Sequence, residues 1–259
     1  MNSRSPANPV TALVNQIEGA RFVLNIYPDA REGGGTFIPT RPYVRGGGIK
    51  GQAADRDRSI QEAARRAKGN VRKYCASHRL NRLGTLTYGG AGCHDQLALR
   101  RDVAEFFRNL RLALGGKSFP YLWVPEWHRT DHGLHVHFAV GKYIPRSLIE
   151  AAWPRGFVHI TLLSDLPVGS TSLGEARMTA RYLSKYVGKS FLDSRRIEGL
   201  HRYEIAQGFK PAVEQITGTS PYALIDLASD RFGSWPSYQW SSDEDPDWRG
   251  GIAFWAQWD

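Results

Sequence analysis

Polar and apolar side chains alternate along the segment GLHVHFAV, residues 133–140, and this alternation constrains the fold more than any other feature. Successive side chains of a β-strand point to opposite faces of a sheet. His135 and His137 therefore share one face, whereas the apolar residues between and around them share the other. The segment predicts a strand with a packed core on one side and two imidazoles on an open side.

The sequence around this strand predicts an α+β fold with elements in the order β-α-β-β-α-β. The predicted ranges are 83–88, 95–114, 119–127, 134–140, 145–153 and 157–163. This order is that of the ferredoxin-like, or RRM-like, antiparallel sheet, in which the first and third strands are neighbours and both helices cover one face. Thr85 and Thr87 of the first strand are then expected beside the two histidines on the other face.

The residues before this region are expected to be less regular. Residues 1–20 are expected to be flexible, residues 22–27 to form a strand and the glycine-rich residues 28–56 to form a long loop. The sequence from Ser59 to Glu62 fits a capping box, which predicts the start of a basic helix that runs to about His78.

Charge is unevenly distributed along the chain. The net charge is +9, yet residues 226–259 hold seven acidic residues against two arginines, so the rest of the chain is more basic than the total. A basic body favours a polyanionic partner such as nucleic acid. The five tryptophans of residues 226–259 are expected to pack onto the body. We therefore expect a flexible segment at 1–20, one domain at 21–225 and a Trp-rich acidic extension at 226–259.

Several classes of protein are disfavoured by features that the sequence lacks. Cys75 and Cys93 form no C-x-x-C motif, which disfavours a zinc cluster and a disulfide framework. No apolar run is long enough to span a membrane, and the N-terminus lacks the apolar stretch of a signal peptide. The sequence also has no P-loop motif. We therefore expect a cytoplasmic protein with no membrane partner and no nucleotide cofactor.

Glu126 is a candidate partner for the two histidines because it lies on the preceding predicted strand. Cross-strand neighbours approach within about 5 Å, so Glu126 can meet His135 and His137 across the hairpin. Two imidazoles and a carboxylate make a three-ligand site for a divalent metal with open positions for phosphate and water. The alternative interpretation is an incidental H-x-H pair with Glu126 as a solvent-exposed strand residue.

A second candidate group lies on the predicted helix that contains YLSKYVGK, residues 182–189. Tyr182 and Tyr186 are four residues apart and share a helix face, as do Lys185 and Lys189. A tyrosine hydroxyl has a pKa near 10 and is a poor nucleophile until a cation or base helps to remove its proton. A neighbouring lysine and a metal would supply that help, whereas a Y-x-x-x-Y pair alone commonly reflects core packing.

The strand LGTLTY, the hairpin VPEWHRTDHGLHVHFAV and the helix RYLSKYVGK occur in the order and spacing of the HUH endonucleases. The chain most resembles the two-tyrosine replication initiators, or Rep proteins, of rolling-circle plasmids and single-stranded DNA phages. The resemblance covers residues 55–210, including HRYEIAQGFKP, which is similar to the segment after the tyrosine helix in actinobacterial-type plasmid Rep proteins.

This resemblance implies a ferredoxin-like sheet with an extra strand, helices on one face and the tyrosine helix over the other. It implies that residues 21–225 are an HUH endonuclease domain. His135, His137 and Glu126 would bind Mg²⁺ or Mn²⁺. The other residues carried over are the nucleophiles Tyr186 and Tyr182, the lysine between them, Lys185, and candidate DNA contacts at Thr85, Thr87, Lys189 and Arg181.

The implied function is rolling-circle replication initiation by metal-dependent, site-specific nicking and joining of single-stranded DNA at an origin through a 5′-phosphotyrosine. A host helicase and DNA polymerase are implied partners. An HUH transposase or a mobilisation relaxase is an alternative within the same chemistry. A non-catalytic nucleic-acid-binding protein on a ferredoxin-like sheet is an alternative of a different class.

Overall fold

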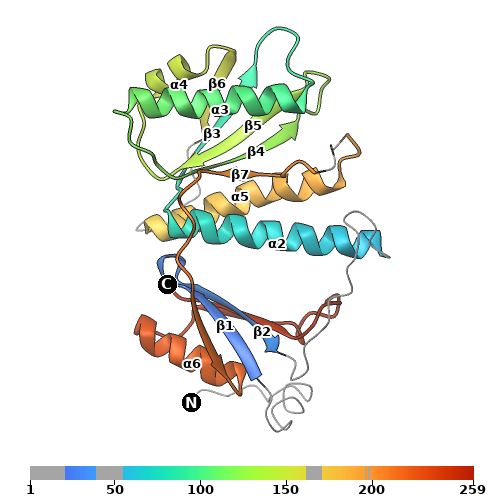
Figure 1. Cartoon of the computed structure of the whole chain (residues 1–259), viewed down its shortest axis with the longest axis vertical. Helices are drawn as coiled ribbons and strands as arrows, with labels where there is room; N and C mark the ends of the chain where they lie inside the picture. Colours follow the sequence, from blue (N-terminus) through green and yellow to red (C-terminus); the bar gives the residue numbers. More distant parts are fainter. Residues whose placement is uncertain (1–20, 39–54, 162–170, 196, 198) are drawn as a thin grey trace. The chain divides into compact units, whose positions relative to one another are not determined.

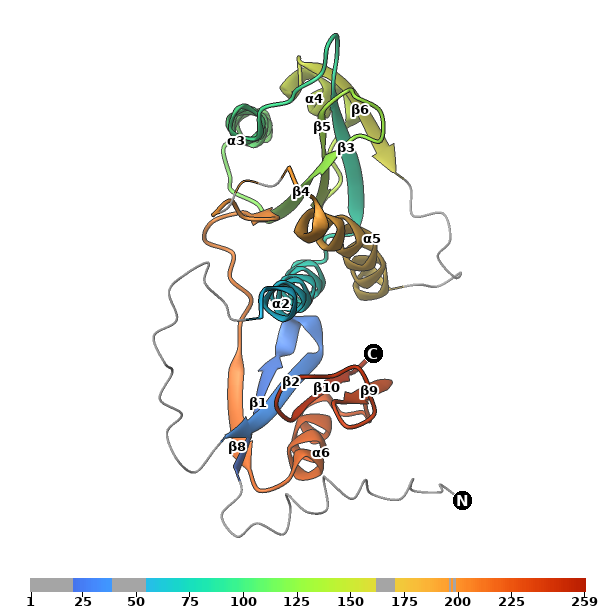
Figure 2. The ribbon, with the colours of Figure 1, turned by 90° about the vertical axis from the view of Figure 1, so that its right-hand side faces the viewer.

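The computed structural model describes residues 21–38, 55–161, 171–195, 197 and 199–259 (Figures 1 and 2). These residues form a mixed α+β structure with two antiparallel sheets and five α-helices. The chain divides into two compact units, Ala53–Pro211 and Met1–Gln52 together with Ala212–Asp259. Among the described helices, none has the length and apolar character needed to cross a bilayer.

The unit of residues 53–211 contains a five-stranded sheet in the order β6-β3-β5-β4-β7. Its elements are α2 (Arg56–Ser77), β3 (Arg82–Tyr88), α3 (Gln96–Ala113), β4 (Tyr121–Trp127), β5 (Leu134–Val140), α4 (Arg146–Ala152), β6 (Gly156–Thr161), α5 (Ser172–Leu192) and β7 (Glu204–Ile205). The predicted ferredoxin-like order is confirmed, with β3 and β5 as central neighbours and β7 as the extra strand. Residues 162 and 163 of the last predicted strand lie outside the described residues.

Helices α3 and α4 cover one face of this sheet (Figure 1). The apolar residues of β5 point into the core between this face and the two helices, as the alternation predicts. Phe106 of α3, Phe138 of β5 and Trp153 after α4 are its largest fully buried side chains. Burial of a side chain of this size stabilises a fold by about 1.5–3 kcal/mol.

Helices α2 and α5 lie on the other face, opposite α3 (Figure 2). Leu183 and Val187 of α5 are fully buried against Leu122 and Val124 of β4. This second core explains why β4 shows no clean alternation in the sequence: both of its faces are buried along Leu122–Val124. The tyrosine helix is therefore fixed to the histidine face by apolar contacts of its own.

Helix α2 begins three residues before the predicted capping box. Asp55 is its N-cap, and the carboxylate of Asp55 accepts the backbone N–H of Arg58 at 2.9 Å. A capping aspartate satisfies a free N–H group of the first turn. Ser59 therefore lies inside the helix, and the prediction of a capping box at Ser59–Glu62 is wrong.

The second unit is a five-stranded antiparallel sheet in the order β8-β1-β2-β10-β9 with one α-helix. Its elements are β1 (Arg21–Tyr27), the short 3₁₀ helix η1 (Pro28–Ala30), β2 (Glu32–Ile38), β8 (Glu214–Gly218), α6 (Pro221–Phe232), β9 (Tyr238–Ser241) and β10 (Ala253–Gln257). The predicted strand at 22–27 is confirmed as β1. This unit joins residues from both ends of the chain, so it differs from the predicted boundaries of 21–225 and 226–259.

Strand β2 lies in the region predicted to be a loop, and that prediction is wrong for residues 28–38. The three glycines Gly33–Gly35 are strand residues because large side chains cross them. A Cβ at Gly35 would lie 2.1 Å from the ring of Phe254 on β10. The rest of the predicted loop, residues 39–54, lies outside the described residues.

The C-terminal tryptophans differ in their environments. Trp258 is fully buried among Phe22, Leu24 and the residues of α6, which confirms the predicted packing for this residue. Trp240 and Trp248 contact each other with ring centroids 5.1 Å apart. Trp235 is 72% exposed and does not pack as predicted.

The crossing of Gly84 by the ring of Phe138 provides a stability test for the ferredoxin-like unit. A Cβ at Gly84 would lie 2.3 Å from this ring, which is 1% exposed and has no room to move. We expect Gly84→Ala to lower the free energy of unfolding by about 1–3 kcal/mol in urea titrations. A Cβ at Gly69 in α2 would meet no atom within 4 Å, so Gly69→Ala should instead raise it by about 0.5–1 kcal/mol. Equal stability of the two variants would contradict this packing.

Candidate functional site

Strand register brings the predicted site residues to one face of the sheet. Glu126 of β4 lies directly opposite His135 of β5, and Thr85 of β3 lies directly opposite His137. Directly opposed residues of antiparallel strands point to the same face. The uncertain orientation of Glu126 is thereby resolved: its side chain lies on the histidine face.

The carboxylate of Glu126 and the two imidazoles converge on one point. The Oε2 atom of Glu126 lies 3.0 Å from Nε2 of His135 and 2.9 Å from Nε2 of His137. The candidate ligand atoms of the three residues all lie within 4.8 Å of one another. His137 is buried, and the other two side chains are largely shielded from solvent. This group could bind a divalent metal ion through two nitrogen atoms and one oxygen atom.

The protonation states of these groups suit metal binding. Burial alone would raise the pKa of Glu126, but hydrogen bonds from His135, His137 and Lys189 hold it well below its usual range. Burial lowers the pKa of His137, although its hydrogen bond to Glu126 opposes this effect. A metal binds the ionised carboxylate and the neutral imidazole, and these are the forms that the two pKa shifts favour.

Thr85 orients one of the imidazoles. Its Oγ1 atom lies 3.0 Å from Nδ1 of His137, on the far side of the ring from Glu126. A hydrogen bond at Nδ1 fixes the ring and leaves Nε2 to bind an ion, as is common among metal-ligating histidines. Thr87, the other predicted residue of β3, lies directly opposite His135 on the same face.

The two tyrosines of α5 lie over the histidines. The ring of Tyr186 stacks on the ring of His137 with centroids 3.8 Å apart and planes at 20°, and the ring of Tyr182 meets His137 edge-on at 5.9 Å. The hydroxyl of Tyr186 donates a hydrogen bond of 2.8 Å to the hydroxyl of Tyr182. The predicted pair therefore shares one face of the helix, and this face meets the Glu126 group.

The hydroxyl of Tyr186 is not activated by its protein surroundings alone. Burial raises its pKa, and the hydrogen bond to Tyr182 and the nearby charge of Glu126 raise it further. The hydroxyl therefore stays protonated at neutral pH. A positive charge introduced next to it, such as a bound cation, would oppose this effect.

The two lysines of α5 lie in different surroundings. Lys189 donates a hydrogen bond of 2.7 Å to Oε1 of Glu126, and its Nζ lies 5.0 Å from the centroid of Tyr186. The Nζ of Lys185 lies 5.9 Å from the centroid of Tyr182. Lys185 and Arg181 are both exposed, and their predicted roles in catalysis and DNA contact stay predictions.

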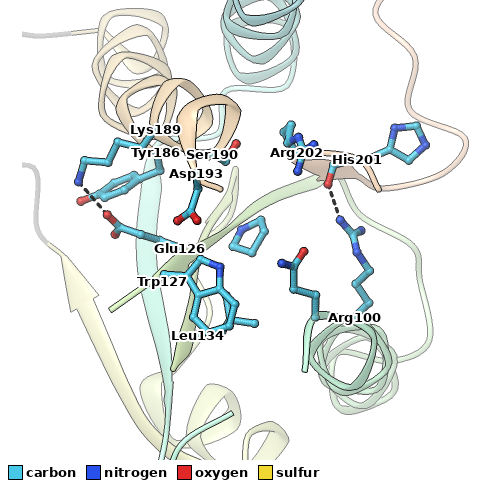
Figure 3. Close-up of a pocket in the computed structure, with 12 residues that line it drawn as sticks. Arg100, Glu126, Trp127, Leu134, Tyr186, Lys189, Ser190, Asp193, His201 and Arg202 are labelled. Carbon is cyan, nitrogen blue, oxygen red and sulfur yellow. Dashed lines mark hydrogen bonds and ion pairs between the residues drawn. The ribbon is translucent and has the colours of Figure 1, made fainter. Parts of the chain in front are cut away.

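A pocket opens beside the Glu126 group (Figure 3). Glu126, Tyr186 and Lys189 form one of its sides. The remaining lining residues are Gln96, Arg100, Pro125, Trp127, Leu134, Ser190, Asp193, His201 and Arg202. Sequence reasoning did not assign these residues to the site. The only signal for any of them was the motif HRYEIAQGFKP, which contains His201 and Arg202.

Comparison with known families gives one match. Residues 81–191 match a family model of replication-associated proteins of the ORF2 type. The matched stretch contains the Glu126 group, both tyrosines and the elements from β3 to α5. No curated protein and no solved structure matches the chain significantly. The match supports a replication-associated function and, in general terms, an initiator or nuclease activity.

The Glu126 group predicts metal binding that depends on both histidines. We expect the chain to bind Mn²⁺, measured by calorimetry or by loss of the free-ion EPR signal, and His135→Ala or His137→Ala to abolish this binding. His159 serves as a control because it is an exposed histidine on β6 that lies opposite Thr85 on the same face. His159→Ala should bind Mn²⁺ as the unaltered chain does; loss of binding in this variant would contradict the assigned site.

The hydrogen bond from Thr85 predicts a smaller effect. Thr85→Val keeps the shape of the side chain but removes the partner of His137 Nδ1. Loss of such an orienting bond typically weakens metal binding by about 10–100-fold. Thr87→Val is the matched control on the same strand and should change the Mn²⁺ affinity far less. Equal effects in the two variants would show that Thr85 does not orient the ligand.

Proposed function

We propose that the chain is a rolling-circle replication initiator that nicks and rejoins single-stranded DNA at an origin through a phosphotyrosine intermediate. The main support is the stacking of Tyr186 on His137, which places a potential nucleophile against a potential metal ligand. The match of residues 81–191 to a replication-associated family supports the same assignment.

His135, His137 and Glu126 would hold the metal, for which Mg²⁺ and Mn²⁺ are the proposed candidates. When bound, the ion withdraws negative charge from a phosphodiester and so favours attack at phosphorus. The donor set fits this role because it combines two neutral imidazoles with one ionised carboxylate. The positions not taken by the three side chains are left for the DNA phosphate and water.

Tyr186 would act as a nucleophile on the DNA backbone. Its Oη atom forms a bond to phosphorus as the bond from phosphorus to the 3′ oxygen breaks. The phenolic proton leaves Oη, and the departing oxygen takes up a proton to become a free 3′-OH. The products are a 5′-phosphotyrosine and a primer end for a DNA polymerase. The energy of the broken bond is kept in the protein–DNA link, so no nucleotide hydrolysis is needed.

Tyr182 would carry out the second transfer. Its hydroxyl is in hydrogen-bond contact with that of Tyr186, so both can reach the same phosphate position. After one round of synthesis, this second tyrosine would cleave the regenerated origin, and the free 3′-OH would attack the first phosphotyrosine to close a circle. Each step exchanges one ester for another, which is why two adjacent nucleophiles suit the reaction.

The cationic side chains of α5 would support DNA binding. Lys185 and Lys189 lie near the two tyrosine rings and would favour the phenolate form, and Arg181 is exposed on the same helix. Thr85 and Thr87 would line the floor of the site. A host helicase and a DNA polymerase are the proposed partners, because the proposed chemistry supplies a primer end but neither unwinding nor synthesis.

Covalent capture of DNA tests this function. The chain is incubated with labelled single-stranded oligonucleotides that tile the DNA molecule carrying its gene, with Mn²⁺ or with EDTA, and run on denaturing gels. We expect a Mn²⁺-dependent adduct that survives SDS, persists in part in Tyr182→Phe and in Tyr186→Phe, and is lost in the double variant. Tyr143→Phe is the control because Tyr143 is 70% exposed and lies outside the site.

The other outcomes separate the alternatives. Loss of the adduct in Tyr186→Phe alone would retain the nuclease and restrict catalysis to one tyrosine, as in single-tyrosine transposases. Tight binding without metal and without an adduct on any strand would contradict the proposal and favour a non-catalytic nucleic-acid-binding protein.

A further inference from the structure

The pocket beside the Glu126 group has the composition of a nucleobase site. One wall is apolar and is formed by Pro125, Trp127 and the buried Leu134. A phosphate group would gain nothing from such a wall, whereas a base has flat apolar faces that gain from it. The pocket also shares Glu126, Tyr186 and Lys189 with the proposed nicking site, so the two sites are continuous.

Gln96 offers polar groups for the edge of a base. This residue is the first of α3, and its Nε2 donates one hydrogen bond of 2.8 Å to the carbonyl of Arg195. A glutamine amide carries two N–H donors and one carbonyl acceptor. One N–H and the carbonyl oxygen are left for a base edge that has a donor beside an acceptor, the arrangement by which glutamine commonly contacts bases.

The segment after α5 closes the pocket on its other side, and Arg100 holds it there. The Arg100 guanidinium donates to the carbonyl of His201 and forms an ion pair with Glu204 (Figure 3). Arg100 also lies over the ring of Trp123, 5.4 Å from its centroid. These contacts make Arg100 a positioning residue that fixes His201 and Arg202 at the pocket.

Charge at the pocket favours a nucleotide over a cationic or neutral ligand. Hydrogen bonds from Arg195 lower the pKa of Asp193, which therefore stays ionised and paired. Arg202 and Lys189 are the cations that line the pocket near this pair. A planar guanidinium such as that of Arg202 can stack on a base or bind a phosphate with two hydrogen bonds.

We infer that this pocket binds the base of a nucleotide adjacent to the scissile phosphate and that Gln96 and Arg202 determine which base is accepted. The inference rests on the proposed nicking function and names the part of the DNA that the same site reads. The scissile phosphate lies at the Glu126 group and the neighbouring base enters between Trp127 and Arg202. Bases further along the strand do not reach this pocket.

Cleavage of altered oligonucleotides tests the inference. In an oligonucleotide that the chain cleaves, each nucleotide around the nick is replaced in turn by the other bases, and the initial rate of adduct formation is measured. We expect the unaltered chain to discriminate by about tenfold or more at one position next to the nick. Gln96→Ala and Arg202→Ala should flatten the profile at this position to within about threefold and leave the profile elsewhere unchanged.

Matched controls separate recognition from folding and from catalysis. Gln61→Ala on α2 and Arg101→Ala on α3 remove the same side-chain types from exposed positions outside the pocket, and both should keep the full profile. Circular dichroism melts of all four variants report on folding. Adduct formation with an unchanged base profile in Gln96→Ala and Arg202→Ala would overturn the inference alone, whereas absence of any adduct in the unaltered chain would overturn the nicking function as well.

Discussion

The candidate site depends on one contact, the meeting of two imidazole nitrogens at a single carboxylate oxygen of Glu126. This contact requires three strands in fixed register, because Glu126, His135, His137 and Thr85 come from β4, β5 and β3. A slip of one residue would turn each side chain of a strand to the opposite face. The apolar residues of β5 prevent such a slip, since it would expose them to solvent.

Two cores on opposite faces of one sheet give the site its geometry. The core beneath α3 and α4 fixes the register of β5, and the core beneath α2 and α5 fixes the tyrosine helix to the face that carries the histidines. Buried Leu183 and Val187 alternate with Tyr182 and Tyr186 along α5, so packing of the former determines where the latter lie. The nucleophiles and the metal ligands are thus held on rigid elements rather than on loops, which favours reproducible geometry for the proposed reaction.

Much of the ferredoxin-like unit could be predicted from the sequence because its strands and helices have clear periodicity. The face of Glu126 could not, since Leu122–Val124 of β4 are buried on both sides and show no alternation. Strand β2 was hidden by Gly33–Gly35, which are typical of loops and form a strand here because the ring of Phe254 crosses them. The pairing of β1 with β8 and of β2 with β10 joins distant parts of the chain, and no local pattern indicates it.

Peptide mapping of the covalent adduct tests the central claim most directly. Trypsin cleaves after Arg181, Lys185 and Lys189, so it separates the peptide Tyr182–Lys185 from the peptide Tyr186–Lys189. The adduct formed with Mn²⁺ is digested with nuclease and then with trypsin, and mass spectrometry locates the remaining nucleotide. The account predicts the nucleotide mass on a tyrosine of one of these two peptides. A nucleotide on any other residue would show that the tyrosines above His137 are not the nucleophiles.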